Sequence, residues 1–146
     1  MTDKYYTPSI EEFHVGFEFE YKEFINGIPK WNKGEIKNSR EIHQIDVWLK
    51  EVKMDGSQIR VKYLDKEDIE SLGWENVEDR GMSENYGYSF QKPIVYLSGG
   101  TAYYRLRYWF TTHRVRIEPL GGPIFDGTIR NKSELKVLLK QLGISG

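Results

Sequence analysis

The chain has 146 residues, the size of one compact domain, and we expect a single globular domain over residues 1–146. Lys and Arg number 21 and Asp and Glu 22, so the net charge of −1 excludes a globally basic nucleic-acid coat, and the absence of cysteine excludes disulfides, thiolate nucleophiles and cysteine-based zinc sites. No apolar run approaches the ~18 residues of a membrane-spanning helix, so we expect a cytoplasmic protein with no membrane partner.

The first part of the chain contains one clear strand among less regular segments. Thr7 fits the N-cap of a short helix over residues 7–13. Apolar and charged residues alternate over 17–22, which predicts a strand with one buried face. Glycines and a proline interrupt residues 26–40, so we expect mostly loop there. Residues 42–52 fit a helical stripe but also contain residues that suit a strand, and both interpretations remain open.

The middle of the chain is rich in strand patterns. Residues 59–63 alternate as a strand, and Asp65 then fits the N-cap of a helix through Ser71 that ends at Gly73. Further strand-like runs occur at 88–91, 94–97, 103–110, 114–117 and 124–129. These runs predict a mostly antiparallel sheet.

The C-terminal residues predict an amphipathic helix. Asn131 to Glu134 form a capping-box-like start, and the helix continues to Leu142 before Gly143. Its leucines recur at i, i+3, i+4 and i+7, so we expect one apolar stripe packed on the core. Because strands predominate in the middle and helices lie at the periphery, we expect an α+β fold with a mostly antiparallel β-sheet, short peripheral helices and this C-terminal helix.

Residues 103–117 are the most informative segment. Two alternating runs flank Thr111-Thr112, which predicts a β-hairpin with a two-residue turn. An odd-length loop would place Arg105 and Arg107 among the core residues, so the even register is favoured by its lower burial cost. The predicted pairs are Phe110 with His113, Trp109 with Arg114, Arg107 with Arg116 and Arg105 with Glu118. One face of the hairpin then holds two rings and four arginines: Tyr103, Arg105, Arg107, Trp109, Arg114 and Arg116.

This face suggests a phosphate-bearing partner. The like-charge pair of Arg107 and Arg116 destabilises a sheet unless water screens it or an anion occupies it. Guanidinium groups suit phosphates, and the rings of Tyr103 and Trp109 offer planes on which a base stacks for about 1–3 kcal/mol. The segment therefore predicts RNA or anion binding, most naturally single-stranded RNA or a nucleoprotein. The alternative is a solvated sheet face whose arginines lie over the rings and pair with acids elsewhere.

Two other charged groups suggest less specific chemistry. Residues 65–84 carry eight acidic residues and two basic ones, a local net charge of −6 that suits either a basic partner or plain solvation. Glu18, Glu20 and Lys22 share one strand face, an acid-x-Lys arrangement with which some nucleases hold a divalent ion and activate water. The three histidines lie far apart and form no H-x-x-x-H or H-E-x-x-H pattern, so we expect no metal site and no cofactor.

Three blocks of the sequence stand out as a set: YYTPSIEEFHVGFE at 5–18, VKYLDKEDIESLGW at 61–74 and GTIRNKSELK at 127–136. Together they resemble a family of small, largely uncharacterised proteins of bacterial, prophage and phage genomes. The resemblance carries no catalytic residue. It implies a protein of a mobile element, and a small cysteine-free protein of that origin suggests an inhibitor of host antiviral defence, including an anti-CRISPR that acts on an RNA-guided nuclease.

The sequence thus leads to one functional prediction and two alternatives. We expect a non-enzymatic binding protein, monomeric or homodimeric, that engages guide RNA or an RNA-guided nuclease through the basic aromatic face. One alternative is a sponge for a nucleotide second messenger. The other is a metal-dependent nuclease that uses Glu18, Glu20 and Lys22.

Overall fold

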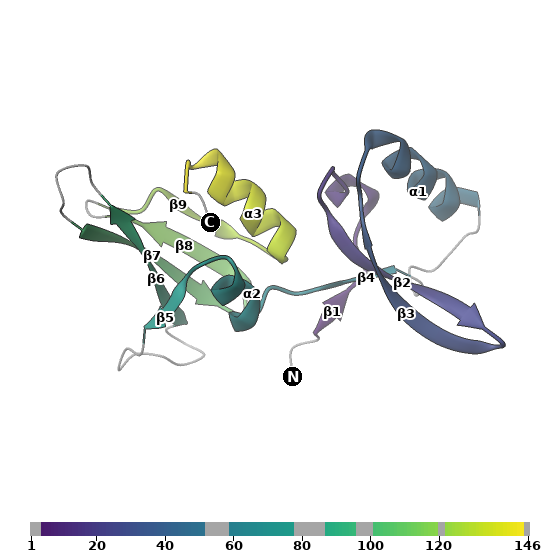
Figure 1. The fold of residues 1–146 in the computed structure, drawn as a ribbon, viewed down its shortest axis with the longest axis horizontal. Coiled ribbons are helices and arrows are strands. Elements are labelled where there is room, and N and C mark those ends of the chain that lie inside the picture. The colour runs from purple at the N-terminus through teal and green to yellow at the C-terminus, as the bar shows by residue number, and fades with distance from the viewer. Residues whose placement is uncertain (1–3, 52–58, 78–86, 96–100, 120–121, 145–146) are drawn as a thin grey trace. The chain divides into compact units, whose positions relative to one another are not determined.

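The computed structural model describes residues 4–51, 59–77, 87–95, 101–119 and 122–144. The chain divides into two compact units, unit 1 (Met1–Tyr63) and unit 2 (Leu64–Gly146). Each unit contains its own antiparallel sheet (Figure 1). Each also has its own cluster of buried apolar side chains. The predicted α+β class is therefore confirmed, including the antiparallel pairing and the C-terminal helix. None of the helices in these ranges combines the length and the apolar composition that crossing a bilayer requires.

Unit 1 contains a four-stranded sheet with the strand order β1-β4-β2-β3. Its elements are β1 (Tyr5–Tyr6), the 3-10 helix η1 (Ile10–Glu12), β2 (Glu18–Ile25), β3 (Ile28–Glu35), α1 (Ser39–Glu51) and β4 (Ile59–Lys62). Five buried apolar residues form its core: Phe13, Phe17, Ile36, Ile59 and Val61. The predicted strands at 17–22 and 59–63 correspond to β2 and β4, whereas β1 was not predicted.

The loop predicted over residues 26–40 is wrong, because β3 occupies most of it. Asn26 and Gly27 have φ values of 54° and 79°, so they form a tight turn whose backbone twist matches that of the flanking strands. Pro29 is tolerated because β3 is an edge strand, where a missing N–H does not interrupt the sheet. The Asn-Gly pair is the sequence signal that identifies this hairpin.

Helix α1 resolves the ambiguity of residues 42–52, since the chain is helical from Ser39 to Glu51. Ile42 and Ile45 pack against the core of unit 1, as a helical stripe requires. The Glu41 N–H donates to Oδ1 of Asn38 at 3.1 Å, which satisfies one of the free donors at the start of the helix. The apolar stripe, and not the strand-like residues, decided the local structure.

The N-terminal helix is shorter than predicted and begins later. Only one 3-10 turn forms, after Ser9, so Thr7 is not its N-cap. The Ser9 N–H donates to Oε2 of Glu12 at 2.7 Å, and Pro8 is buried before the turn begins. The carboxylate three residues along the chain therefore determines where this helix begins.

Unit 2 contains a five-stranded sheet with the order β5-β6-β7-β8-β9. Its elements are α2 (Lys66–Ser71), β5 (Glu75–Val77), β6 (Tyr88–Val95), β7 (Thr101–Trp109), β8 (Arg114–Glu118), β9 (Phe125–Thr128) and α3 (Lys132–Gln141). The runs predicted at 88–91 and 94–97 belong to one strand as far as Val95, and residues 96–97 lie outside the described residues. Strand β5 was not predicted, because its three residues are too few to show alternation.

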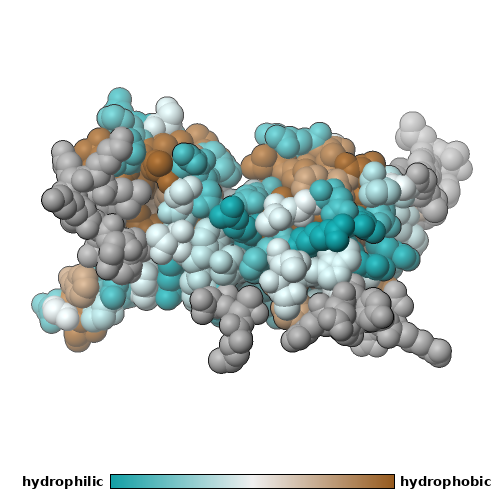
Figure 2. All heavy atoms as spheres, turned by 180° about the vertical axis from the view of Figure 1, so that it is seen from behind, coloured by the Kyte–Doolittle hydropathy of each residue, from teal (hydrophilic) through white to brown (hydrophobic). Residues whose placement is uncertain are grey.

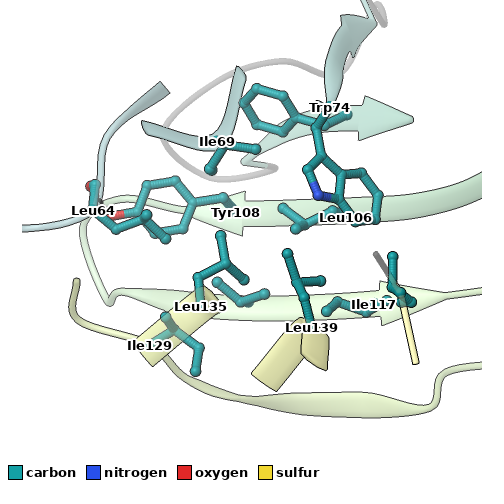
Figure 3. Close-up of a cluster of buried hydrophobic side chains, with 12 residues drawn as sticks. Leu64, Ile69, Trp74, Leu106, Tyr108, Ile117, Ile129, Leu135 and Leu139 are labelled. Atoms are coloured by element: carbon teal, nitrogen blue, oxygen red, sulfur yellow. Dashed lines mark hydrogen bonds between the residues drawn. The ribbon is translucent and has the colours of Figure 1, made fainter. Parts of the chain in front are cut away.

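The two helices of unit 2 cover one face of its sheet. Ile69 of α2 and Leu135 and Leu139 of α3 pack with Leu106 and Tyr108 of β7, as Figure 3 shows. The leucine stripe of α3 is therefore core, as predicted. The other face of the sheet is free of these helices and carries the alternate side chains of each strand.

The predicted helix ends of unit 2 are confirmed. Oδ1 of Asp65 accepts from the Asp68 N–H at 2.8 Å, and Gly73 ends α2 with a φ of 93°. Oδ1 of Asn131 accepts from the Glu134 N–H, also at 2.8 Å, and starts α3. These caps satisfy backbone donors within a few residues, so the local sequence is sufficient to place them.

Candidate nucleic-acid interface

The β7–β8 hairpin has the predicted register. Its pairs include Trp109 with Arg114, Arg107 with Arg116, and Arg105 with Glu118. Beyond Trp109 the chain turns through residues 110–113, so the predicted Phe110–His113 pair is not one of the strand pairs.

The turn differs from the prediction because His113 has a φ of 57°. A residue in this left-handed conformation redirects the chain, and the loop therefore spans four residues and not two. Because two and four are both even, the same side chains share a face in either loop. Leu106, Tyr108, Val115 and Ile117 are buried on the core side, as predicted.

The central strand of the sheet presents a row of two arginines between two aromatic rings, which we call the ladder. Its members are alternate residues of β7 on the face that α2 and α3 leave open: Tyr103, Arg105, Arg107 and Trp109. The Cα atoms of neighbouring members are about 6.8 Å apart. Tyr103 is 49% exposed, Arg105 is exposed, and Arg107 and Trp109 are half-buried. In Figure 2 strongly hydrophilic side chains gather in one area of unit 2.

The two arginines of β8 are held by a carboxylate from β9. Arg114 donates from Nε and Nη2 to the two oxygens of Asp126 at 2.7 and 2.6 Å. Arg116 donates to Oδ2 of the same residue at 3.2 and 3.1 Å, and its Nη1 lies 3.5 Å from Oε1 of Glu118. The hydrogen bonds from Arg114, with those from Arg116, lower the pKa of Asp126 to about 2.

Asp126 explains how the sheet tolerates two arginines side by side. The register places Arg107, Arg116 and Asp126 in one row across β7, β8 and β9. The carboxylate offsets the repulsion between the two guanidinium groups that the sequence predicted would need water or an anion. Sequence reasoning missed Asp126, because it predicted the strand at 124–129 without assigning its register to β8.

The arginines of β7 differ from those of β8 in their ion pairing. In the described part of the chain neither Arg105 nor Arg107 forms an ion pair with a carboxylate. Arg107 lies with Cζ 5.9 Å from the ring centre of Trp109, and Arg114 and Arg116 approach the same ring at 5.1 and 5.8 Å. One indole thus holds three guanidinium groups around it and keeps them at the surface.

Two of the three acidic residues on this face lie on the edge strands β5 and β9, and the third, Glu118, pairs with Arg105. By register, Glu75 of β5, Glu118 of β8 and Asp126 of β9 share the face with the four arginines, which leaves one more positive than negative charge among the described residues. The positive charge is concentrated on β7 and β8, in the middle of the sheet.

The hairpin end beside Trp109 is held by buried contacts. The Tyr108 hydroxyl donates to the Leu64 carbonyl at 2.6 Å, and Nδ1 of His113 lies 3.4 Å from that hydroxyl. Burial raises the pKa of Tyr108, with Asp65 and Asp68 adding to the effect, and burial followed by the charge of Arg130 lowers the pKa of His113. Both groups are therefore neutral near pH 7.

The acid-x-Lys group of β2 does not assemble as a metal site in the structure. Glu20 forms an ion pair with Arg60 at 3.0 Å, and Nζ of Lys22 lies over the rings of Phe24 and Trp31 at 5.5 and 5.8 Å. Among the described residues, no three His, Asp or Glu side chains cluster in a way that would hold a metal ion. Of the acidic stretch 65–84, residues 78–84 lie outside the described residues.

Comparisons with protein-family models, with curated proteins and with solved structures found no match. The resemblance of residues 5–18, 61–74 and 127–136 to a family of phage and bacterial proteins therefore stays a prediction.

Proposed function

We propose that this chain is a non-enzymatic protein that binds single-stranded RNA through the open face of unit 2. One observation carries the proposal: Arg105 and Arg107 stand between Tyr103 and Trp109 on the central strand, and neither is ion-paired within the described residues. Proteins that bind single strands combine such cations with rings on which bases stack. The other two arginines, Arg114 and Arg116, lie on the same face and donate hydrogen bonds to Asp126 of β9.

Each side chain of the ladder has its own role in binding. Arg105 and Arg107 donate charge-assisted hydrogen bonds to successive phosphates of an extended strand. Tyr103, half-exposed at one end, offers its ring to a base, and Trp109 at the other end keeps the guanidinium groups in place while its outer edge contacts the next base. Sequence-independent affinity with a preference for unpaired bases follows from this arrangement.

The partner that the sequence resemblance implies is a guide RNA or an RNA-guided nuclease of host defence. Unpaired segments of a guide RNA present the phosphates and unstacked bases that the ladder suits. By occupying such a segment, the chain would inhibit the nuclease by contact, and no bond would be broken.

The test compares two charge reversals in unit 2. Arg105→Glu with Arg107→Glu removes two phosphate contacts from the face, and Lys136→Glu with Lys140→Glu makes the same change of charge on exposed positions of α3. With a fluorescently labelled single-stranded RNA, we expect anisotropy to show binding weaker by at least roughly 100-fold for the arginine variant, because each of the two charge-assisted hydrogen bonds contributes about 1.5–3 kcal/mol. The lysine variant should bind within about twofold of the native chain.

The salt dependence gives a second criterion. For single strands the slope of log affinity against log salt is about −0.7 for each neutralised phosphate, so Arg105→Glu with Arg107→Glu should reduce the slope by about 1.4. If both charge reversals weakened RNA binding equally and left the salt slope unchanged, the proposal that this face binds RNA would be wrong. A melting temperature raised by a cyclic nucleotide and not by RNA would instead favour the second-messenger sponge.

A further inference from the structure

The outer part of the β2–β3 hairpin extends beyond the sheet of unit 1. Among the described residues, β4 pairs with β2 at Glu20 and Tyr21, whereas β2 and β3 pair as far as Ile25 and Ile28 (Figure 1). We call residues 22–31 the arm. Its residues 23–30 are all exposed, and a two-stranded ribbon is only marginally stable in water.

The tip of the arm is apolar on both faces. Phe24, Ile25 and Ile28 are 60%, 51% and 68% exposed, three of the largest values among apolar residues of the described chain. The register pairs Phe24 with Pro29 on one face and Ile25 with Ile28 on the other. A flat protein surface would cover one of these faces and leave the other in water, whereas a surrounding apolar medium covers both.

A basic and aromatic band follows directly behind the tip. Lys22 pairs with Trp31 on the Phe24 face, and Lys30 pairs with Glu23 on the Ile28 face, so each face has a lysine, in adjacent rows of the ribbon. These positions lie two residues behind the apolar pairs, which is about 7 Å along the ribbon. An apolar end with lysine and tryptophan just behind it is the pattern of segments that enter the headgroup region of a bilayer.

We propose that the arm inserts its tip into an anionic lipid surface. The distance of about 7 Å from tip to lysine matches the 5–10 Å to which interfacial segments enter a bilayer, so the ammonium groups of Lys22 and Lys30 would lie at the phosphates. A stable protein partner or a second copy would need about 800 Å² from this chain, far more than four side chains provide.

This inference does not depend on the RNA proposal, and it departs from the sequence-based expectation of no membrane partner. That expectation rested on the absence of a long apolar run. In the arm the apolar residues are brought together by a turn within the segment FINGIP, 24–29, which is far too short to register as such a run.

The test measures binding of the full chain to vesicles. Because the chain has no cysteine, Ile28→Cys provides a single thiol for an environment-sensitive dye, and Val15→Cys, 58% exposed in the same unit, is the control. We expect a blue shift for the dye at position 28 with vesicles of phosphatidylcholine and phosphatidylglycerol, and little shift with phosphatidylcholine alone. The dye at position 15 should not respond to either vesicle.

Substitutions separate insertion from charge attraction. In vesicle sedimentation, Phe24→Ser with Ile25→Ser and Ile28→Ser should weaken binding by about tenfold or more, and Lys22→Gln with Lys30→Gln should remove the requirement for phosphatidylglycerol together with most of the binding. Arg105→Glu with Arg107→Glu should leave vesicle binding unchanged. No blue shift at position 28, or an arm-dependent dimer by light scattering in the absence of vesicles, would refute lipid insertion.

Discussion

The two sheets of this chain differ in how their strands are supported. In unit 2 the strands β6, β7 and β8 each have a neighbour on both sides, and α2 and α3 cover one face. In unit 1 no strand or helix among the described residues lies beside the arm. The supported sheet holds charged groups in place by ion pairs and ring contacts, whereas the unsupported ribbon exposes apolar groups. The sheet of unit 2 therefore suits a charged ligand, and the arm suits an apolar one.

The largest expected effect tests whether the two units are separate cores. Leu135→Ala should destabilise unit 2 by about 2–5 kcal/mol, and Phe17→Ala should destabilise unit 1 by about 3–5 kcal/mol, because both side chains are completely buried. Residue-resolved hydrogen exchange should show the loss of protection confined to the substituted unit. Equal loss in both units for either variant would mean that the chain unfolds as one body and would remove the basis of the comparison.

A smaller effect is expected at Tyr108, whose hydroxyl is the buried link between β7 and Leu64. Tyr108→Phe leaves the carbonyl of Leu64 without this donor and should cost about 1–3 kcal/mol. Because burial raises the pKa of Tyr108, the folded chain keeps the phenol proton to a higher pH than the unfolded chain does. The contribution of the Tyr108 phenol to stability is thus fully present below the usual tyrosine pKa of about 10, and it is lost as pH rises above that value.

Denaturant titrations between neutral and alkaline pH measure this loss. The native chain should lose stability in unit 2 above about pH 10, and the Tyr108→Phe variant should lose much less over the same range. The same alkaline loss in both proteins would show that another group is responsible.

The smallest effect on stability, and a clear one on binding, is expected at Asp126. Asp126→Asn removes the charge that holds Arg114 and Arg116, so both become available to phosphates. We expect RNA affinity to rise by about three- to tenfold, with a steeper salt dependence, and only a small change in stability because this ion-pair cluster is at the surface. Weaker RNA binding by this variant would show that the carboxylate positions the arginines and does not compete for them.

The pH dependence of Asp126 follows from its lowered pKa. The carboxylate is ionised in the folded chain down to about pH 2, so its contribution to stability is present above the usual carboxyl pKa and is lost as pH falls from about 4 towards 2. NMR titration of the side-chain carboxyl should show this midpoint, and a midpoint near 4 would mean that the arginines are not bound to it in solution.

Prediction from sequence succeeded best where the evidence lies within a few residues. The caps at Asp65 and Asn131 and the glycines at the ends of α2 and α3 were all correct, because a cap bonds to a backbone N–H three residues away. It failed at β3, where a proline and glycines were taken as loop residues and the Asn26-Gly27 turn was overlooked. The short strands β1 and β5 are too brief for a two-residue period to show.

By itself, the sequence determined the register of the β7–β8 hairpin and therefore which side chains share the open face of unit 2, since a slip by one residue would bury Arg105 and Arg107. Only the tertiary structure decided how those arginines differ, because Asp126 reaches Arg114 and Arg116 through the pairing of a further strand. The tertiary structure also decided that the arm extends past β4 with its apolar tip exposed. Alternation and caps are local, whereas strand neighbours and the ion pairs between them depend on the whole fold.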